Sequence, residues 1–171
     1  MEERNFIPLQ IAILKVSDTR TEETDTAGKM LAELIQEEGH HFNEKVIVPD
    51  DIYQIRAAVS KWVAEEKVNV IITTGGTGVT GRDGTPEAVS PLLDKEIQGF
   101  GEMFRNLSYE KIGMSTIQSR CLAGVINGVY IFCLPGSKGA CKDGWELMKG
   151  QLDYRTRPCN LVELMPRLKE K

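Results

Sequence analysis

Short continuous runs of hydrophobic residues alternate along the chain with hydrophobic residues spaced as on one face of a helix. The runs suited to a buried strand are residues 11–16, 46–48 and 129–134, which are mostly hydrophobic, and residues 68–74, which are β-branched almost throughout. Helical spacing follows the first two runs, at residues 27–35 and 52–63. Strands that alternate with amphipathic helices predict βαβ units, right-handed crossovers and a mostly parallel sheet.

Polar residues and glycines mark where the helices are expected to begin and end. Thr26 is predicted to cap the first helix, and Gly39 is well placed to end it. Thr85 stands before a proline, which predicts another helix with Thr85 as its N-cap. A further helix is expected within residues 97–113, interrupted by its glycines. Another helix is expected to begin after the Pro-Gly-Ser turn and to end at about Gln151.

Composition and charge limit the kinds of partner that the protein is expected to bind. The 171 residues, 41% hydrophobic and 27% charged, are typical of a globular protein and fit one domain, residues 1–171. A net charge of −4 argues against binding of nucleic acid, which usually requires a basic face. No hydrophobic run reaches the roughly 20 residues of a membrane span, and the polar N-terminus does not resemble a secretory signal. We expect a cytoplasmic protein that binds neither nucleic acid nor membrane.

A glycine-rich segment, TTGGTG at residues 73–78, follows the third hydrophobic run. Glycines allow positive φ and a close approach of the backbone, so successive N–H groups and the threonine hydroxyls can point at one anion. The segment lacks the ending of a P-loop and the spacing of the dinucleotide-binding fingerprint, and a tight turn would also require glycine. The candidate phosphate-binding residues are Thr74, Gly75, Gly76, Thr77 and Gly78.

Two carboxylates that follow predicted strands suit a magnesium site. Asp83 lies shortly after the glycine-rich segment, and Mg²⁺ is usually held by one or two carboxylates together with substrate phosphates. Asp50 follows the second run, and its neighbour Asp51 is a natural helix cap. The alternative is that these carboxylates cap helices or lie in solvated turns, and for Asp50 taken alone this alternative is the stronger one.

Polar residues also follow the first and fourth runs. Gly136 and Ser137 stand with Lys138 at a strand-to-helix junction, where the N–H groups of a helix start favour an anion. Ser17 and Asp18 occupy the corresponding place after the first run. Ligands of parallel sheets bind beyond the carboxyl ends of the strands. We therefore expect all of these residues to meet the glycine-rich segment at one edge of the sheet.

Cysteine and histidine spacing gives no metal signature. The four cysteines have no CxxC spacing, which favours reduced and mostly buried thiols over a disulfide or a zinc site. They are Cys121, Cys133, Cys141 and Cys159. His40 and His41 lie at a predicted helix-to-strand turn with no third ligand nearby in the sequence, which favours a surface turn over metal binding.

Four segments are specific in combination: TTGGTG at 73–78, GRDGTPEA at 81–88, GFGEMFR at 99–105 and LPGS at 134–137. Together they resemble the MoaB/MogA family of molybdenum-cofactor biosynthesis proteins, which includes the G domains of gephyrin and its plant relatives. The resemblance includes Ser17-Asp18 and extends from residue 11 to about residue 159. The length, the N-terminal extension and the RTRPCN segment near the C-terminus resemble MoaB more than MogA.

The resemblance implies a fold, an assembly and an activity. The fold is a three-layer α/β sandwich, assembled as a homotrimer or, for MoaB-like proteins, a homohexamer. The activity is adenylylation of molybdopterin by Mg-ATP with release of pyrophosphate, and the product is passed on to other proteins of the pathway. The catalytic aspartates of the family match Asp50 and Asp83, which would bind Mg²⁺ or align the phosphates.

The resemblance also leaves an alternative open. Some MoaB-type proteins lack adenylyltransferase activity, and at least some have lost the first aspartate. A catalytically inactive molybdopterin-binding or carrier protein is therefore the second hypothesis, although retention of both Asp50 and Asp83 favours an enzyme. The sequence leaves open whether five further residues serve the pocket or only the fold: Glu102, Arg105, Lys138, Arg155 and Arg157.

Overall fold

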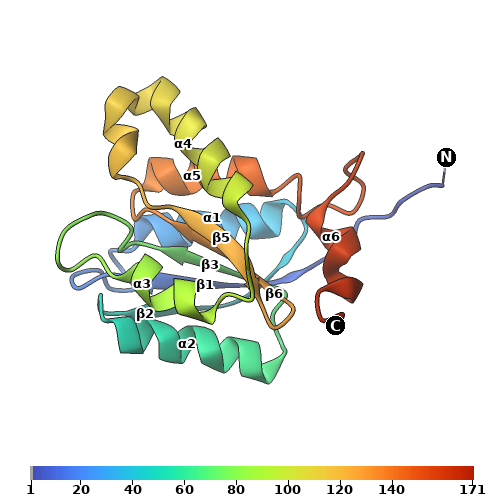
Figure 1. The fold of residues 1–171 in the computed structure, drawn as a ribbon, viewed down its shortest axis with the longest axis horizontal. Helices are drawn as coiled ribbons and strands as arrows, with labels where there is room; N and C mark the ends of the chain where they lie inside the picture. The colour runs from blue at the N-terminus through green and yellow to red at the C-terminus, as the bar shows by residue number, and fades with distance from the viewer. Residues whose placement is uncertain (1) are drawn as a thin grey trace.

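The computed structural model describes residues 2–171, which form a six-stranded sheet between two layers of helices (Figure 1). The strands are β1 (Gln10–Val16), β2 (His41–Val48), β3 (Val70–Thr74), β4 (Lys95–Glu96), β5 (Leu122–Ile126) and β6 (Val129–Leu134). The helices are α1 (Thr26–Glu37), α2 (Ile52–Glu65), α3 (Thr85–Val89), α4 (Gln98–Ile112), α5 (Lys138–Met148) and α6 (Leu161–Leu164). Helices α1, α4 and α5 cover one face of the sheet, and α2 and α3 cover the other.

The order of the strands in the sheet is β2-β1-β3-β6-β5-β4. The strands β2, β1, β3 and β6 are parallel to one another, whereas β5 runs antiparallel to both β6 and β4. The predicted three-layer α/β fold with a mostly parallel sheet is therefore confirmed. The carboxyl ends of β1, β2, β3 and β6 lie at the same edge, so the loops that carry the predicted site residues begin there.

Each face of the sheet buries its own hydrophobic cluster. Under α1, α4 and α5, Ile13 and Phe132 pack with Trp145, and under α2 and α3, Leu14 packs with Trp62. Successive side chains of a strand point to opposite faces, so a strand that is covered on both faces needs hydrophobic residues at almost every position. This requirement explains the continuous runs that identify β1, β3 and β6.

Two predicted helix caps are wrong. The N-cap of α1 is Asp25, whose carboxylate accepts a hydrogen bond from Gly28 N at 3.0 Å, and Thr26 is already helical. Thr85 is likewise the first residue of α3, after the N-cap Gly84. The Thr85 hydroxyl donates instead to Gly75 O at 2.8 Å, because α3 starts directly against the glycine-rich loop. By contrast, Asp51 caps α2 as predicted, and Gly39 follows α1 with a φ of 97°.

Helix α4 is continuous, although its glycines predicted breaks. A Cβ on Gly99 would meet nothing within 4 Å, whereas one on Gly101 would lie 2.7 Å from Cys121 O. Gly101 therefore allows α4 to pack closely on the start of β5, and this packing offsets the low helix propensity of glycine. Helix α5 also differs from its prediction, since it ends at Met148 rather than near Gln151.

The sequence prediction missed strands β4 and β5. An Asn127-Gly128 turn, with φ values of 44° and 82°, joins β5 to β6. Asn-Gly is a strong signal for a tight hairpin, so this signal was present in the sequence. The starts of two other strands also differ from the prediction: β2 begins at His41, before the predicted residue 46, and β3 begins at Val70, after the predicted residue 68.

His40 is buried, so its expected place in a surface turn is wrong. Its side chain is 4% exposed, and its Nδ1 accepts a hydrogen bond from Leu9 N at 3.1 Å. The imidazole packs against Phe6 and the edge of Trp145. Within residues 2–171 no three His, Cys, Asp or Glu side chains form a metal-binding group. His40 is therefore a core residue, and its hydrogen bond with Leu9 N holds the backbone directly before β1.

The cysteines are mostly buried, as predicted, and the two tail arginines whose roles the sequence left open have contacts within the fold. All four cysteines are free thiols, and only Cys159 is exposed. Arg155 forms an ion pair with Asp153 at 2.8 Å, and Arg157 donates to Glu2 O, so both stabilise the tail and the N-terminal segment beside it. In residues 2–171 we find no helix with the length and hydrophobicity that crossing a bilayer requires.

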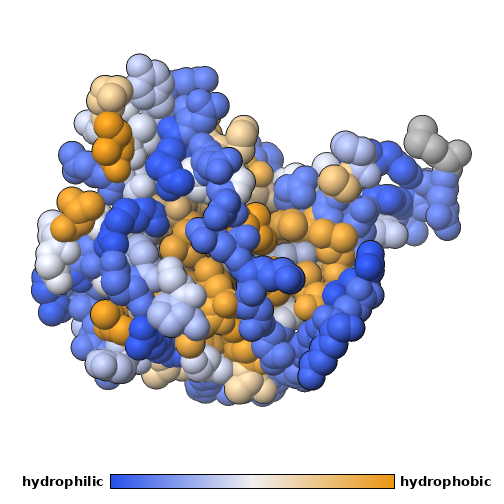
Figure 2. Space-filling view, viewed as in Figure 1, coloured by the Kyte–Doolittle hydropathy of each residue, from blue (hydrophilic) through white to orange (hydrophobic). Residues whose placement is uncertain are grey.

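Large hydrophobic side chains stay exposed on α4 and on the 3₁₀ helix η2 (Gly113–Gln118) that follows it. They are Met103, Tyr109, Ile112, Met114 and Ile117, each more than half exposed. Figure 2 shows hydrophobic atoms at this corner of the molecule, set among hydrophilic ones. Clusters of exposed hydrophobic residues commonly mark surfaces that contact another protein.

Candidate functional site

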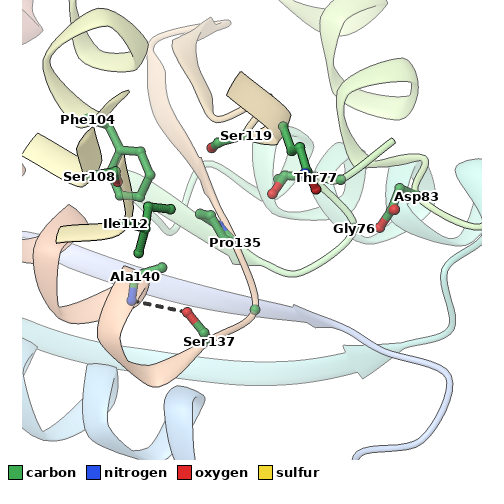
Figure 3. Close-up of a pocket in the computed structure, with 13 residues that line it drawn as sticks. Gly76, Thr77, Asp83, Phe104, Ser108, Ile112, Ser119, Pro135, Ser137 and Ala140 are labelled. Carbon is green, nitrogen blue, oxygen red and sulfur yellow. Dashed lines mark hydrogen bonds between the residues drawn. The ribbon is translucent and has the colours of Figure 1, made fainter. Parts of the chain in front are cut away.

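The loops that follow β3 and β6 meet α4 around a cavity of about 310 Å³ (Figure 3). The loop after β3 contributes Gly76, Thr77, Gly78 and Asp83, and the loop after β6 contributes Pro135, Gly136 and Ser137. The remaining lining residues are Phe104, Ser108, Ile112, Gln118, Ser119 and Ala140. One end of the cavity is thus built from glycine-rich backbone and a carboxylate, and the other from hydrophobic side chains with hydroxyl and amide groups.

The glycine-rich loop is held by hydrogen bonds from both neighbouring segments. Gly75 and Gly76 have φ values of 110° and 71°, which residues with a side chain rarely adopt. Gly75 N donates to Leu134 O at 2.9 Å, which joins this loop to the end of β6. A Cβ on Gly76 would lie 2.4 Å from Thr85 Oγ1 and 2.9 Å from Asp50 Oδ2. The loop conformation therefore depends on glycine at both positions.

The threonines of this loop differ in where their side chains lie. Thr74 is fully buried, and its hydroxyl donates to Pro135 O at 3.1 Å, so it supports the second loop from below. Thr77 is also almost fully buried, but it lines the cavity. Of the predicted phosphate-binding residues in this segment, Gly76, Thr77 and Gly78 line the cavity, whereas Thr74 and Gly75 lie behind it.

Asp83 lines the cavity and stays ionised. Its Oδ2 accepts hydrogen bonds from Thr80 N at 2.9 Å and from Thr80 Oγ1 at 2.7 Å. Burial alone would raise the pKa of Asp83, but these bonds, the Gly78 N–H and the charge of Arg120 hold that pKa below its ordinary value. A carboxylate that is charged at neutral pH beside glycine backbone suits a divalent cation that arrives with a phosphate.

Asp50 lies behind the glycine-rich loop, next to Gly76 and Gly84. Its Oδ1 accepts a hydrogen bond from Gly84 N at 3.1 Å, while its Oδ2 accepts none within residues 2–171. Burial raises the pKa of Asp50, the charges of Asp83 and Asp18 raise it further, and the Gly84 N–H only partly opposes the shift. A carboxylate that burial and like charges destabilise would gain from a nearby cation.

Asp18 and Ser17 support this edge of the sheet rather than line the cavity. Asp18 accepts a hydrogen bond from Asp50 N at 3.0 Å and is paired with Arg82, whose Nη2 lies 2.7 Å from Asp18 Oδ1. Hydrogen bonding to Arg82 lowers the pKa of Asp18. The Ser17 hydroxyl accepts from two N–H groups of its own loop. The pair Asp18–Arg82 therefore connects the loops after β1 and β3 across Asp50.

Ser137 ends the second loop and begins α5. Its hydroxyl accepts a hydrogen bond from Ala140 N at 3.2 Å as the N-cap of the helix, which Figure 3 shows as a dashed line. Gly136 and Ser137 are both exposed to solvent at the cavity. The strand-to-helix junction, where the sequence predicts an anion site, therefore borders the cavity. Lys138 is exposed and is not among the residues that line the cavity.

Sequence reasoning missed the wall of the cavity that α4 and η2 provide. Phe104, Ser108 and Ile112 are spaced four residues apart, so they share one face of α4, and Figure 3 shows Phe104 and Ile112 close to Pro135 and Ala140. The Ser119 hydroxyl is buried and has no hydrogen-bond partner within the described chain. The spacing of Phe104, Ser108 and Ile112 indicates that they share a helix face, but only the packing of α4 shows that this face lines the cavity.

Arg120 is a further residue that the motifs did not reveal. Its guanidinium donates to Gly78 O at 2.8 Å and to Asp83 O at 3.3 Å, and it pairs with Glu87. It therefore holds the backbone on both sides of the 79–82 turn. Arg105 and Glu102 lie elsewhere: Arg105 donates to Cys121 O and supports α4, and Glu102 is exposed.

A family comparison agrees with this geometry. Residues 12–153 match the family model described as "probable molybdopterin binding domain". Molybdenum cofactor biosynthesis protein B of Escherichia coli (strain K12) is 55% identical over 156 residues, which cover 91% of this chain and 92% of that protein. The protein of the same name from Bacillus cereus is 52% identical over 131 residues, with coverage of 76% and 78%.

Solved structures are similar as well. A crystal structure of molybdenum cofactor biosynthesis protein B has a TM-score of 0.84 and 46% identity, covering 87% of this chain and 94% of that one. The tungsten cofactor synthesizing protein MoaB from Pyrococcus furiosus has a TM-score of 0.76 and 38% identity, with coverage of 85% and 92%. With its fold, its glycine-rich cavity and these matches, the chain belongs to the molybdenum cofactor biosynthesis family that is defined by the probable molybdopterin binding domain.

Proposed function

We propose that this protein binds molybdopterin in the cavity and adenylylates it with Mg-ATP, releasing pyrophosphate. The observation that carries the proposal is the division of the cavity into two ends. The glycine-rich end, with Asp83 beside it, suits phosphate groups and a cation, and the end formed by Phe104 and Ile112 suits a flat ring system. The buried Ser119 hydroxyl, unpartnered within residues 2–171, would gain a hydrogen bond from such a ring.

The proposed chemistry requires positioning rather than a protein nucleophile. An oxygen of the molybdopterin phosphate attacks the α-phosphorus of ATP, a new P–O–P bond forms, and the bond to the β-phosphate breaks as pyrophosphate leaves. Two anions must be held in line, so the N–H group of Gly76 and the start of α5 would orient the phosphates. Mg²⁺ would neutralise the charge that develops on the phosphate oxygens, and Asp83 and Asp50 would bind it.

The carboxylate geometry is compatible with a cation that the substrate brings. The described chain has no cluster of three metal-ligating side chains, so these carboxylates would complete their share of the coordination with phosphate oxygens and water. Asp83 is ionised, and Oδ2 of Asp50 accepts no hydrogen bond within residues 2–171. Both carboxylates border the loop 76–78 that would hold the phosphates.

An adenylylation assay tests the proposal. Purified protein with molybdopterin, ATP and Mg²⁺ is expected to form adenylylated molybdopterin and pyrophosphate in equal amounts. Omission of either Mg²⁺ or molybdopterin should stop pyrophosphate release. Binding of molybdopterin without any product would contradict the proposal and would identify a carrier protein of the same pathway.

Replacement of Asp50 by Asn is expected to lower the enzymatic rate and to raise the thermal stability. Asp50→Asn and Asp50→Ala should both lower the rate of adenylylation, because a ligand for Mg²⁺ is lost. The raised pKa of Asp50 means that its ionised form costs folding stability above that pKa, and that the cost disappears as the pH falls through it. Asp50→Asn should therefore have a higher Tm than wild type near pH 7, and the difference should shrink in acid. Thermal unfolding between pH 4 and pH 8 measures it.

A neighbouring carboxylate provides the control for this experiment. Asp51→Asn changes the net charge equally, but Asp51 is exposed and its Oδ1 can still cap α2. Neither its activity nor its Tm should change markedly. If Asp50→Asn lowered the Tm while retaining the wild-type rate, Asp50 would be a structural residue and not part of the site.

We also propose that the protein is a homo-oligomer, a trimer or a hexamer as the family resemblance implies. The exposed hydrophobic residues of α4 and η2 support an interface between copies, since their exposure in a monomer would be unfavourable. Because α4 also provides a wall of the cavity, an interface there would lie beside the site. Sedimentation of the purified protein measures the number of subunits.

A further inference from the structure

Lys15 is a buried cation that the proposed chemistry has not used. It lies next to Thr74 across the β1–β3 pairing, just before the loops of the site begin. Its side chain is 5% exposed, its Nζ donates to Gly136 O at 3.2 Å, and it lies 3.5 Å from Asp25 Oδ1. A charged group is costly to bury, so its neighbours must compensate for the lost water.

The neighbours of Lys15 compensate only part of the positive charge. Asp25 is also buried, but it is shared with Lys45, whose Nζ lies 3.0 Å from Asp25 Oδ2. Glu22 pairs with Lys45 from the surface, where its side chain is 69% exposed. The buried group therefore contains two ammonium ions and one carboxylate. Counted with Glu22 the charges balance, but Glu22 is exposed to solvent, so the buried part of the group keeps an excess of positive charge beneath the loop that contains Gly136.

Lys15 also determines how the loop after β6 is oriented. The Gly136 carbonyl points toward the ammonium group, and in a trans peptide the N–H of the next residue points the opposite way. That N–H belongs to Ser137, which lines the cavity and donates no backbone hydrogen bond within residues 2–171. Gly136 in turn lies against Gly75, because a Cβ on Gly136 would be 3.4 Å from Gly75 Cα. The buried ammonium group of Lys15 therefore lies beneath the point where the loops after β3 and β6 contact each other.

We propose that Lys15 is a positioning residue for the phosphate end of the cavity. By binding the Gly136 carbonyl it directs the Ser137 N–H toward the bound phosphate, and the charge of its ammonium group attracts the same anion from below. The ammonium group already pairs with Asp25, and a phosphate bound above Gly136 would add a second anion that offsets the cost of burying it. The inference rests on the proposed function only in requiring that this end of the cavity binds phosphate groups.

Two lysines that share one carboxylate provide a matched test. Lys15→Met and Lys45→Met each remove one cation from Asp25, but only Lys15 contacts the loop of the site. Binding of inorganic pyrophosphate is measured by calorimetry at several salt concentrations. Lys15→Met is expected to weaken binding about tenfold or more and to reduce its salt dependence, while Lys45→Met stays within about twofold of wild type.

Two further variants separate charge from geometry and guard against misfolding. Lys15→Arg keeps a cation and a donor and should restore most of the affinity. Lys15→Gln keeps a donor for Gly136 O without the charge, so it should lose the salt-dependent part of the binding, and it serves as the test if Lys15→Met does not fold. Wild-type affinity in both neutral variants, equal weakening by Lys45→Met, or a wild-type protein that binds no pyrophosphate would each overturn the inference.

The experiment distinguishes this inference from the proposed function. Pyrophosphate binding requires neither molybdopterin nor turnover. A wild-type protein that binds pyrophosphate but forms no adenylylated product would contradict the enzyme proposal and leave the role of Lys15 intact. A protein that forms the product, and whose Lys15→Met variant binds pyrophosphate normally, would contradict only the role of Lys15.

Discussion

Asp83→Asn is expected to reduce the formation of adenylylated molybdopterin by about 100-fold or more, while the fold stays nearly intact. Asp83 is the ionised carboxylate of the cavity, and an amide binds Mg²⁺ far more weakly than a carboxylate does. The Asn side chain still offers an oxygen to Thr80, so unfolding should become easier by less than about 1 kcal/mol. The rate at saturating ATP and Mg²⁺, together with urea unfolding, measures both effects.

The partner of Asp83 supplies the control. Thr80→Val removes the hydroxyl that donates to Asp83 Oδ2 at 2.7 Å but leaves the carboxylate in place. If Asp83 acts by binding the metal, Thr80→Val should retain most of the activity. Equal losses in both variants would show that the order of the 79–83 turn, and not metal binding, explains the effect. A large fall in Tm for Asp83→Asn would point the same way.

Gly75→Ala is expected to be the most destabilising single change in the site, at about 3–5 kcal/mol. Gly75 has a φ of 110°, which strains any residue with a side chain, and the new Cβ would lie 2.1 Å from Val16 O. That oxygen belongs to the backbone of β1, so neither group can move without disturbing the sheet. The Tm of a chain of this size should fall by roughly 10 °C or more, and phosphate binding should be lost with it.

A glycine in α4 serves as the comparison. A Cβ on Gly99 would meet nothing within 4 Å, and this residue lies in a helix, where alanine is preferred. Gly99→Ala should leave the Tm unchanged or slightly higher. A Gly75→Ala protein with the Tm of wild type would mean that the loop after β3 can adopt another conformation, and the anion site built on it would then need a different explanation.

The mostly parallel arrangement of the strands and the edge that carries the site follow from features that are local in the sequence. The strand β3 consists of β-branched residues that are all buried because both of its faces are covered, and glycines and a threonine follow it directly. Such a run identifies a central strand without knowledge of its neighbours. Since parallel strands end at one edge, the proximity of Asp50, Gly76 and Ser137 could be expected from the pattern alone.

Other features depend on contacts between segments far apart in the chain. In the sequence, Gly101 predicts a break in the helix, yet α4 is continuous because this glycine packs against Cys121 O. Asp25 and Lys15 belong to no motif and lie in different segments, but they meet beneath Gly136. Neither contact leaves a periodic signal, because periodicity reports on one element and not on what that element packs against.

By itself, therefore, the sequence determined the α/β fold, the loops that build the site, and the aspartates and glycines in them, since hydrophobic spacing and backbone chemistry act over a few residues. The tertiary structure alone decided which of those residues face the cavity. It placed Thr74 and Gly75 behind the wall, brought Phe104 of α4 to the opposite side, and put a buried ammonium below the phosphate end. These outcomes depend on how helices pack across the sheet, and packing is a property of the whole chain.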